Sequence, residues 1–254
     1  MALDPHLLNA IRFLTVVPTP HADGAPAPDW LARAMKYFPL VGAGIGVASA
    51  MVFVIACHIW SPLIGAILAV TTSLALTSAL HEDGLADTAD AFGGGWTIEK
   101  RLAIMKDSRI GTYGALALGL GCALRIAALA ALPIWAGAAA LIAMHAAARA
   151  MPAFVMNRLV YAGETSAMKV SYADAPVRRE AMTFLLVTAA IAALPLALLS
   201  FKAVILGTLL GAALGALLAR SAKRLIGGYT GDVLGAIEQL FEIGFLLGVA
   251  AALK

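Results

Sequence analysis

The sequence contains few charged residues. Lys, Arg, Asp and Glu make up only 13% of its 254 residues, whereas hydrophobic residues make up 61%. A soluble globular domain has about 25% charged residues and about 45–50% apolar ones. This composition excludes an ordinary water-soluble fold. We therefore expect an all-α, polytopic integral membrane protein that forms a single domain over residues 1–254.

Cysteine is scarce, and a basic leader is missing. Only Cys57 and Cys122 occur, both in apolar segments, which favours packed thiols over a disulfide or a metal site. The N-terminal MALDPHLL has no basic region before an apolar core, so we expect no cleaved signal peptide. The net charge of +3 is small and its basic residues are spread along the chain, so no nucleic-acid partner is expected.

The apolar residues gather in seven runs that are each long enough, or nearly so, to cross a bilayer, which needs about 20 residues. A short N-terminal segment, residues 6–17, cannot span and carries Arg12, so it is typical of an interfacial helix. Very short turns join six of the seven runs into three helical hairpins. The runs cover residues 38–60, 62–80, 112–132, 133–151, 182–200, 203–219 and 233–253.

The basic residues predict the orientation in the membrane. Fifteen of the 18 Lys and Arg fall in four segments outside the hairpins: 1–37, 82–111, 149–181 and 220–232. The positive-inside rule places these segments in the cytoplasm. Every acidic residue outside the last apolar run also lies in them. The sequence therefore predicts a polar site on the cytoplasmic face.

The first polar stretch is HEDGLADTAD, residues 81–90. Its Asp83, Asp87 and Asp90 stand at i, i+4 and i+7, within about 60° of one another on a helix. Like charges placed in this way repel. A solvated acidic helix end is the alternative, but Mg²⁺ held by carboxylates and substrate phosphates would relieve the repulsion. We expect a metal site at these three aspartates, with His81 and Glu82 as weaker candidates.

The second polar stretch is KDSRIGTYG, residues 106–114. Lys106 and Arg109 are able to hold phosphate oxygens, and Gly111 precedes an apolar run whose N-terminal amides would face an anion. The alternative is an ordinary basic loop beside a membrane span. We assign substrate binding in this stretch to Lys106, Asp107, Ser108, Arg109 and Gly111.

The third polar stretch is GGYTGDVLGAIEQLFE, residues 227–242. Thr230 to Asp232 are typical of a loop and a helix N-cap. Gln239 and Glu242 share a helix face with Asp232, within about 80° of one another, and Glu238 lies just off its edge.

Acids inside an apolar helix are costly and are therefore functional candidates, although a polar contact between helices is the alternative. Arg125 and Arg149 are the matching cations, which would either pair with these acids or bind phosphate, and we favour a pair between Glu242 and Arg125. His145 is interpreted as a packed histidine rather than a ligand.

Together, HEDGLADTAD, IMKDSRIGTYG and GGYTGDVLGAIEQLFE resemble the three signature stretches of the cobalamin synthase family, the adenosylcobinamide-GDP ribazoletransferases. The N-terminal FLTVVPTP and YFPLVGAGIG are similar to that family as well, so the resemblance runs along the whole chain in order. Many relatives have an Arg where Val16 stands and another near Gly163. Any phosphate contact made by those arginines is absent or relocated here.

The resemblance implies a Mg²⁺-dependent enzyme of the bacterial inner membrane. Such an enzyme joins adenosylcobinamide-GDP to α-ribazole or its 5′-phosphate, forming adenosylcobalamin or its 5′-phosphate, and releases GMP. The base that accepts the hydroxyl proton is left unassigned, and a homo-oligomer is left open. We expect catalytic roles for Asp83, Asp87, Asp232 and Glu242, and substrate contacts, besides those in residues 106–111, from Thr230, Gln239 and Arg149.

Two other functions stay open at this point. A CDP-alcohol phosphotransferase also uses spaced aspartates and Mg²⁺ in the membrane, but its pattern continues from Asp-Gly through Ala-Arg, whereas Asp87 follows Ala86 here. An ion-coupled transporter would line a path at the membrane midplane with acids. Here the acids gather at one face, and no convincing internal repeat is found.

Overall fold

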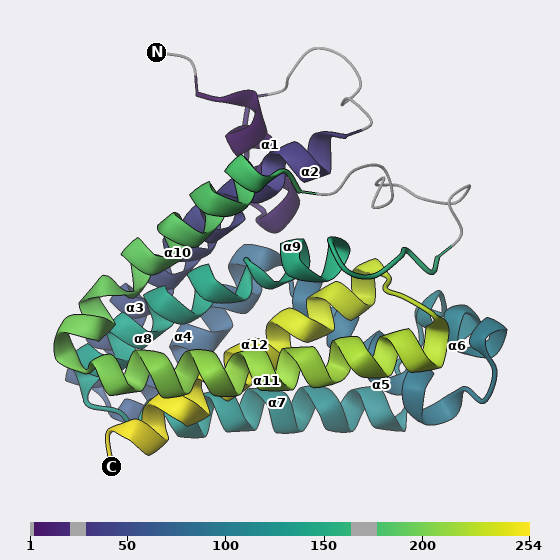
Figure 1. Cartoon of the computed structure of the whole chain (residues 1–254). Helices are drawn as coiled ribbons and strands as arrows, with labels where there is room; N and C mark the ends of the chain where they lie inside the picture. Colours follow the sequence, from purple (N-terminus) through teal and green to yellow (C-terminus); the bar gives the residue numbers. More distant parts are fainter. Residues whose placement is uncertain (1–2, 21–28, 164–176) are drawn as a thin grey trace.

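The structure is a computed structural model that describes residues 3–20, 29–163 and 177–254. Within these ranges every regular element is helical, and the β pairing is limited to an isolated parallel bridge between Tyr161 and Tyr229. The all-α prediction is confirmed (Figure 1). In chain order the elements are α1 (Pro5–Leu14), α2 (Trp30–Ala34), the 3-10 helix η1 (Met35–Tyr37), α3 (Phe38–Ile59), α4 (Pro62–Thr77), α5 (Leu80–Gly94), α6 (Ile98–Met105), α7 (Thr112–Ala130), α8 (Ile134–Ala148), α9 (Met151–Met156), α10 (Arg179–Leu199), α11 (Phe201–Ile226) and α12 (Gly231–Ala252).

The predicted membrane spans are present. Six stretches of the described chain are helical, long and apolar enough to cross a membrane, and α4 with α5 makes a seventh if the two count as one bent span. The seven apolar runs of the sequence correspond to α3, α4, α7, α8, α10, α11 and α12. The protein is therefore a polytopic helical membrane protein. α1 occupies the predicted interfacial segment, although its position relative to the bilayer stays a prediction.

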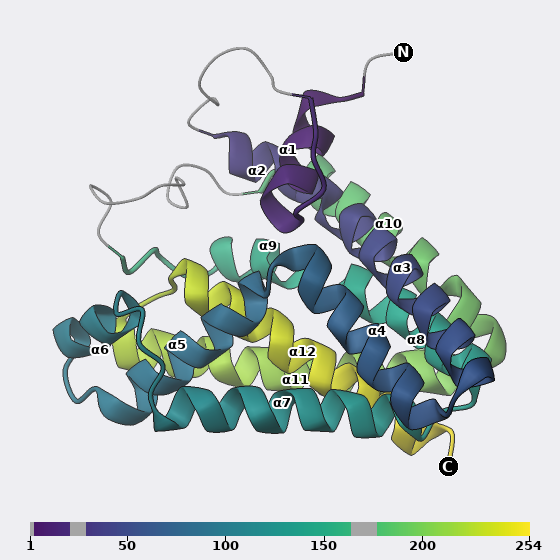
Figure 2. The ribbon, with the colours of Figure 1, turned by 180° about the vertical axis from the view of Figure 1, so that it is seen from behind.

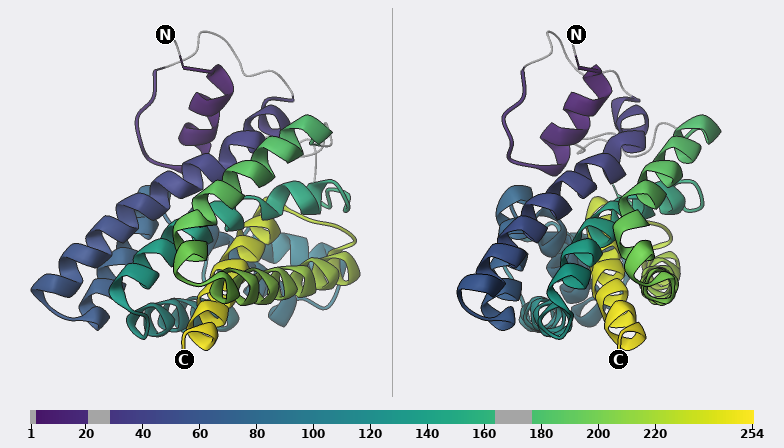
Figure 3. Two further views of the ribbon diagram at one scale, coloured as in Figure 1. Left: turned by 60° about the vertical axis from the view of Figure 1, so that its left-hand side comes forward. Right: turned by 90° about the vertical axis from the view of Figure 1, so that its left-hand side faces the viewer.

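α12 lies at the centre of the bundle. In its most apolar stretch 78% of the residues are buried, whereas the corresponding fraction is 22% in α11 and 17% in α10. α10 packs on α3 and α8, and α11 crosses α12 (Figure 3). The α11–α12 contact is close because a Cβ on Gly244 would lie 2.8 Å from the Cα of Gly211. α10 and α11 thus have surfaces left for lipid, and α12 carries the buried groups.

A sharp bend separates α4 from α5. The predicted run 62–80 ends early, because Ser78 and Ala79 adopt left-handed backbone conformations with φ of 51° and 54°. The two helix axes meet at 90°. The chain after α1 lies against the bend, where the amide of Val16 donates to the carbonyl of Leu76 at 2.8 Å (Figure 2). The bend directs α5, with its aspartates, along α12 and α7.

Candidate active site

The first and third polar stretches meet where α5 crosses the first turns of α12. A Cβ on Gly84 would lie 2.6 Å from the carbonyl oxygen of Asp232, so a larger residue would push the two helices apart. One turn further along, a Cβ on Gly235 would lie 3.2 Å from the Cα of His81. Small residues on both helices therefore bring the aspartates of α5 to the N-terminus of α12.

Three aspartates form an acidic cluster at this crossing: Asp83 and Asp87 of α5 and Asp232 of α12. Asp83 is exposed, whereas Asp87 and Asp232 are half-buried. Burial, together with the negative charges of Asp83, Asp232 and Asp90, raises the pKa of Asp87 to about 7. Within the described residues no Lys or Arg forms an ion pair with the three acids of this cluster. Their repulsion is the condition that a bound cation relieves.

Asp90 has a different environment from the one expected of a metal ligand. Its two carboxylate oxygens accept hydrogen bonds from the backbone N–H groups of Gly111 and Gly114, at 2.7 and 2.9 Å. Asp90 therefore caps the N-terminus of α7, where an acid also interacts favourably with the helix dipole. The amide of Gly111, predicted to contact substrate, is occupied by this carboxylate.

The predicted ligand trio Asp83, Asp87 and Asp90 does not converge on one point. Among the described residues, no three His, Cys, Asp or Glu side chains lie close enough together to hold a metal ion by themselves. Helical spacing correctly placed the three acids on one side of α5. It did not reveal that α7 would dock on Asp90. The third acid beside Asp83 and Asp87 is therefore Asp232 of α12, and not Asp90.

The loop after α6 carries the second polar stretch. Arg109 forms a forked pair with Asp107, with its Nη2 2.6 Å from Oδ2, and both groups are accessible to solvent. This pairing holds the pKa of Asp107 at about 2. Ser108 is exposed beside them. Burial and the charge of Asp232 raise the pKa of Tyr161, and the charge of Lys106 lowers it.

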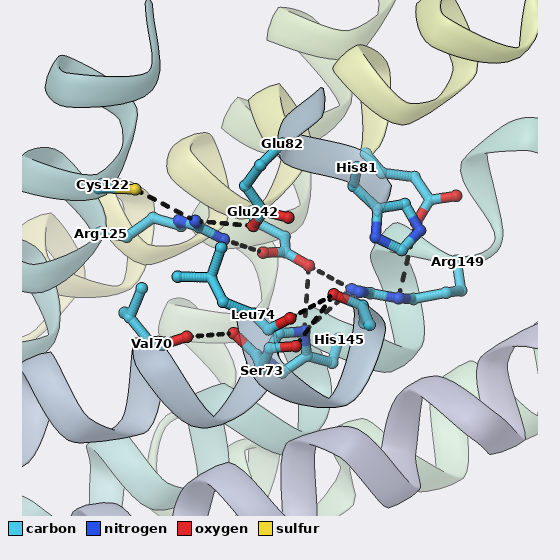
Figure 4. Close-up of polar contacts among 12 residues, drawn as sticks. Val70, Ser73, Leu74, His81, Glu82, Cys122, Arg125, His145, Arg149 and Glu242 are labelled. Atoms are coloured by element: carbon cyan, nitrogen blue, oxygen red, sulfur yellow. Dashed lines mark hydrogen bonds and ion pairs between the residues drawn. The ribbon is translucent and has the colours of Figure 1, made fainter. Parts of the chain in front are cut away.

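A buried ionic network lies deeper along α5 and α12 (Figure 4). Arg125 of α7 bridges Glu82 and Glu242, with N–O distances of 2.9 and 2.8 Å. The other oxygen of Glu242 contacts Arg149 and lies 3.0 Å from Nδ1 of His145. Glu242 is 0% exposed. The predicted pairing of Arg125 with Glu242 is confirmed.

His81 and Glu238 extend this network towards the acidic cluster, since both line one cavity with Asp83 and Asp232. Nε2 of His81 lies 3.0 Å from Oε2 of Glu238, and Nε of Arg149 lies 3.5 Å from the same oxygen. All three side chains are buried. Sequence reasoning ranked His81, Glu82 and Glu238 low. A charged or titratable side chain next to or within an apolar segment was the sequence signal for these three residues. Their ion-pair partners lie on other helices, which the periodicity of one helix does not reveal.

Two other predicted substrate residues, Thr230 and Gln239, lie on α12. The Thr230 hydroxyl accepts the N–H of Val233 at 3.3 Å, which confirms the predicted N-cap. It also lies 3.5 Å from Oδ2 of Asp232, so it helps to orient that carboxylate. Gln239 is buried within the bundle. Thr230 is therefore close to the acidic cluster, and Gln239 lies deeper.

Two cavities adjoin the acidic cluster. A cavity of about 110 Å³ is lined by Asp83, Asp232 and Glu238, and apolar residues of α1 to α3 close it. A wider one, about 490 Å³, opens at the α4–α5 bend and is lined by Arg12, Val16 and Asp83, among others. Asp83 faces both. Arg12 therefore supplies a cation beside Val16.

Fold and site together define a polytopic membrane protein with an acidic site at one end of its central helix. The sequence profile of the cobalamin-5-phosphate synthase family matches residues 6–250. The chain belongs to this family.

Relatives cover nearly the full length of the chain. The adenosylcobinamide-GDP ribazoletransferase of Bradyrhizobium diazoefficiens is 45% identical, over 95% of this chain and 92% of the relative. The enzyme of the same name from Azorhizobium caulinodans is also 45% identical, over 94% of this chain and 93% of the relative. The one from Shewanella piezotolerans is 40% identical, over 93% of this chain and 91% of the relative. No solved structure matches the chain.

Proposed function

We propose that the chain is an adenosylcobinamide-GDP ribazoletransferase. The hydroxyl of α-ribazole, or of its 5′-phosphate, attacks the phosphorus next to the aminopropanol arm of the corrinoid. The new P–O bond forms as the bond to GMP breaks, and GMP leaves. The names of the relatives support this reaction. The structural observation that carries it is the meeting of Asp83 and Asp87 with Asp232, which brings two distant polar stretches to one accessible site.

We further propose that this site binds Mg²⁺. The donor set fits, because Mg²⁺ is usually held by one or two carboxylates, waters and substrate phosphates rather than by a full set of protein ligands. Burial and, after it, the charges of Asp83, Asp232 and Asp90 raise the pKa of Asp87, so a cation beside it would stabilise its carboxylate. Two of the three carboxylates of Asp83, Asp87 and Asp232 would hold it, together with waters and the diphosphate of the substrate. When bound, the metal would neutralise charge on the diphosphate.

The other residues have supporting roles in this proposal. Arg12 lines a cavity with Asp83 and would contact phosphate oxygens, and we assign the same role to Lys106. Glu242 and Arg149, predicted to act on substrate, are instead buried and joined to each other. Because neither reaches a cavity that adjoins the cluster, we assign them a positioning role in which they hold α8 and α7 against α12.

The orientation and the compartment are also proposals. We infer a bacterial inner-membrane location with the acidic cluster on the cytoplasmic side, supported by the distribution of Lys and Arg. In a background lacking Cys57 and Cys122, a cysteine at Thr97 should resist an impermeant thiol reagent in intact cells. A cysteine at Trp60, in the α3–α4 turn, should react. Ser166, another cytoplasmic position suggested by the sequence, lies outside the described residues.

The test of the function uses purified protein in liposomes with adenosylcobinamide-GDP, α-ribazole and Mg²⁺. We expect equal amounts of a cobalamin and GMP. The matched control is Asp232→Asn, which should insert normally and form product at least about a hundredfold more slowly. Uptake of the corrinoid without formation of GMP would overturn the proposal in favour of a transporter.

A further inference from the structure

A second cavity system lies away from the acidic cluster, between α9 and α11. Its volume is about 440 Å³. Its walls are apolar side chains and backbone from both helices: Met151, Phe154, Val155, Leu159, Gly215 and Ala219. Nothing in the proposed transferase reaction uses this groove.

Three cations line the groove, and no acid does. They are Arg158, after α9, and Arg220 and Lys223, at the C-terminal end of α11. All three are exposed, and none forms an ion pair with an acid in the described part of the chain. The guanidinium of Arg158 lies over the ring of Phe154, 5.9 Å from its centroid, so it sits at the boundary between cations and apolar wall.

The groove continues onto an apolar helix surface. Leu209 and Leu217 of α11 are 63% and 62% exposed. α11 is long and apolar enough to cross a membrane, and little of its apolar stretch is buried by protein. These leucines therefore face lipid, and the cations stand at the end of the helix where lipid headgroups lie. The α11 side of the groove therefore adjoins a surface exposed to lipid.

We propose that this groove binds one anionic phospholipid of the surrounding bilayer. Its phosphate would lie among Arg158, Arg220 and Lys223, and an acyl chain would follow the apolar wall. The arrangement favours an anionic lipid over a zwitterionic one, because three cations without a neighbouring acid attract net negative charge. It favours a lipid over free phosphate, because phosphate would leave the apolar wall uncovered. The inference does not depend on the transferase activity.

The site would stabilise the helices that carry the active site. A Cβ on Gly215, in the groove wall, would lie 3.3 Å from Cγ2 of Ile237 of α12. α9 also packs on α12. A lipid that bridges α9 and α11 therefore braces the same helix whose first turn holds Asp232.

The test is native mass spectrometry of the full chain released from detergent, titrated with phosphatidylglycerol or with phosphatidylcholine of the same chain length. We expect one phosphatidylglycerol bound at least tenfold more tightly than phosphatidylcholine. The double variant Arg220→Gln/Lys223→Gln should bind phosphatidylglycerol about thirtyfold more weakly, since each basic residue near a membrane surface contributes about a fivefold factor in affinity. Arg224→Gln with Lys202→Gln removes the same charge from the same helix outside the groove and should change little.

A second pair of variants tests the apolar wall. Ala216→Leu fills the groove without changing charge and should reduce retention of phosphatidylglycerol. Ala123→Leu is an exposed change of equal size on α7, which does not line the groove, and should not. Equal affinity for both lipids would overturn the proposal. So would an equal loss of phosphatidylglycerol affinity in the double variant of the groove and in the control double variant, Arg224→Gln with Lys202→Gln. Displacement of the lipid by inorganic phosphate at similar concentrations would also overturn it, by showing a phosphate site.

Discussion

Glu242 and Asp232 lie on the same helix, but the structure predicts opposite consequences of neutralising them. Glu242 is fully buried and contacts Arg125, Arg149 and His145. Glu242→Gln keeps the shape but leaves both arginines with one fewer acid. Removing one partner of a buried ion pair costs about 3–5 kcal/mol. We expect Glu242→Gln to lower the free energy of unfolding by about 3 kcal/mol, the lower end of this range, because Arg125 keeps its contact with Glu82 at 2.9 Å.

Asp232→Asn should lower activity without lowering stability. Asp232 is half-buried beside Asp83 and Asp87, and these acids repel one another. Neutralising it removes repulsion, so the free energy of unfolding should be unchanged or higher. Activity should fall by about a hundredfold or more, as expected when a strong electrostatic contact to the reacting phosphate is lost.

The assay combines unfolding in detergent micelles with steady-state release of GMP, measured on the same preparations. The expected pattern is a large stability loss with modest kcat loss for Glu242→Gln, and the reverse for Asp232→Asn. A double-mutant cycle of Glu242→Gln and Arg125→Met should show coupling above about 0.5 kcal/mol. Additive losses, or a stable Glu242→Gln protein with hundredfold lower kcat, would refute the positioning role and make Glu242 a substrate contact.

Three further predictions concern the aspartates of α5. Asp83→Asn should lower activity by at least about a hundredfold with normal membrane insertion, and near-normal turnover at limiting Mg²⁺ would contradict its assignment as a ligand. The pKa of Asp87 of about 7 means that a proton competes with the cation at low pH, so the apparent Mg²⁺ affinity should rise about tenfold from pH 6 to pH 8. That rise should disappear in Asp87→Asn. Asp90→Ala should cost about 1 kcal/mol of unfolding free energy through loss of the α7 cap, and thermal unfolding that matches the unmodified protein would exclude this role.

Much of the helical framework could be predicted from the sequence. Spans as apolar as these have few alternatives in a bilayer, and the Thr230 cap and the Arg125–Glu242 pair followed from local chemistry and the cost of burying charge. The α4–α5 bend could not be predicted, because the residues at the bend are Ser78 and Ala79 and not the Pro or Gly that usually marks a helix break. The capping role of Asp90 also depends on where a distant helix docks.

The acids of α5 and α12 fall into two groups, and the difference explains how a membrane helix bundle keeps a charged site open. Glu82, Glu238 and Glu242 are buried, and each has an arginine or histidine partner. Asp83 and Asp232 come from the same two helices but point to the accessible end, where they meet like charge. The pairs of Glu238 and Glu242 tie α12 to α5, α7 and α8, and the Glu82–Arg125 pair ties α5 to α7. The helices therefore cannot separate to relieve the repulsion at the end. The buried ion pairs thus hold the aspartates close together, and a cation with its phosphate ligand is the remaining way to neutralise them.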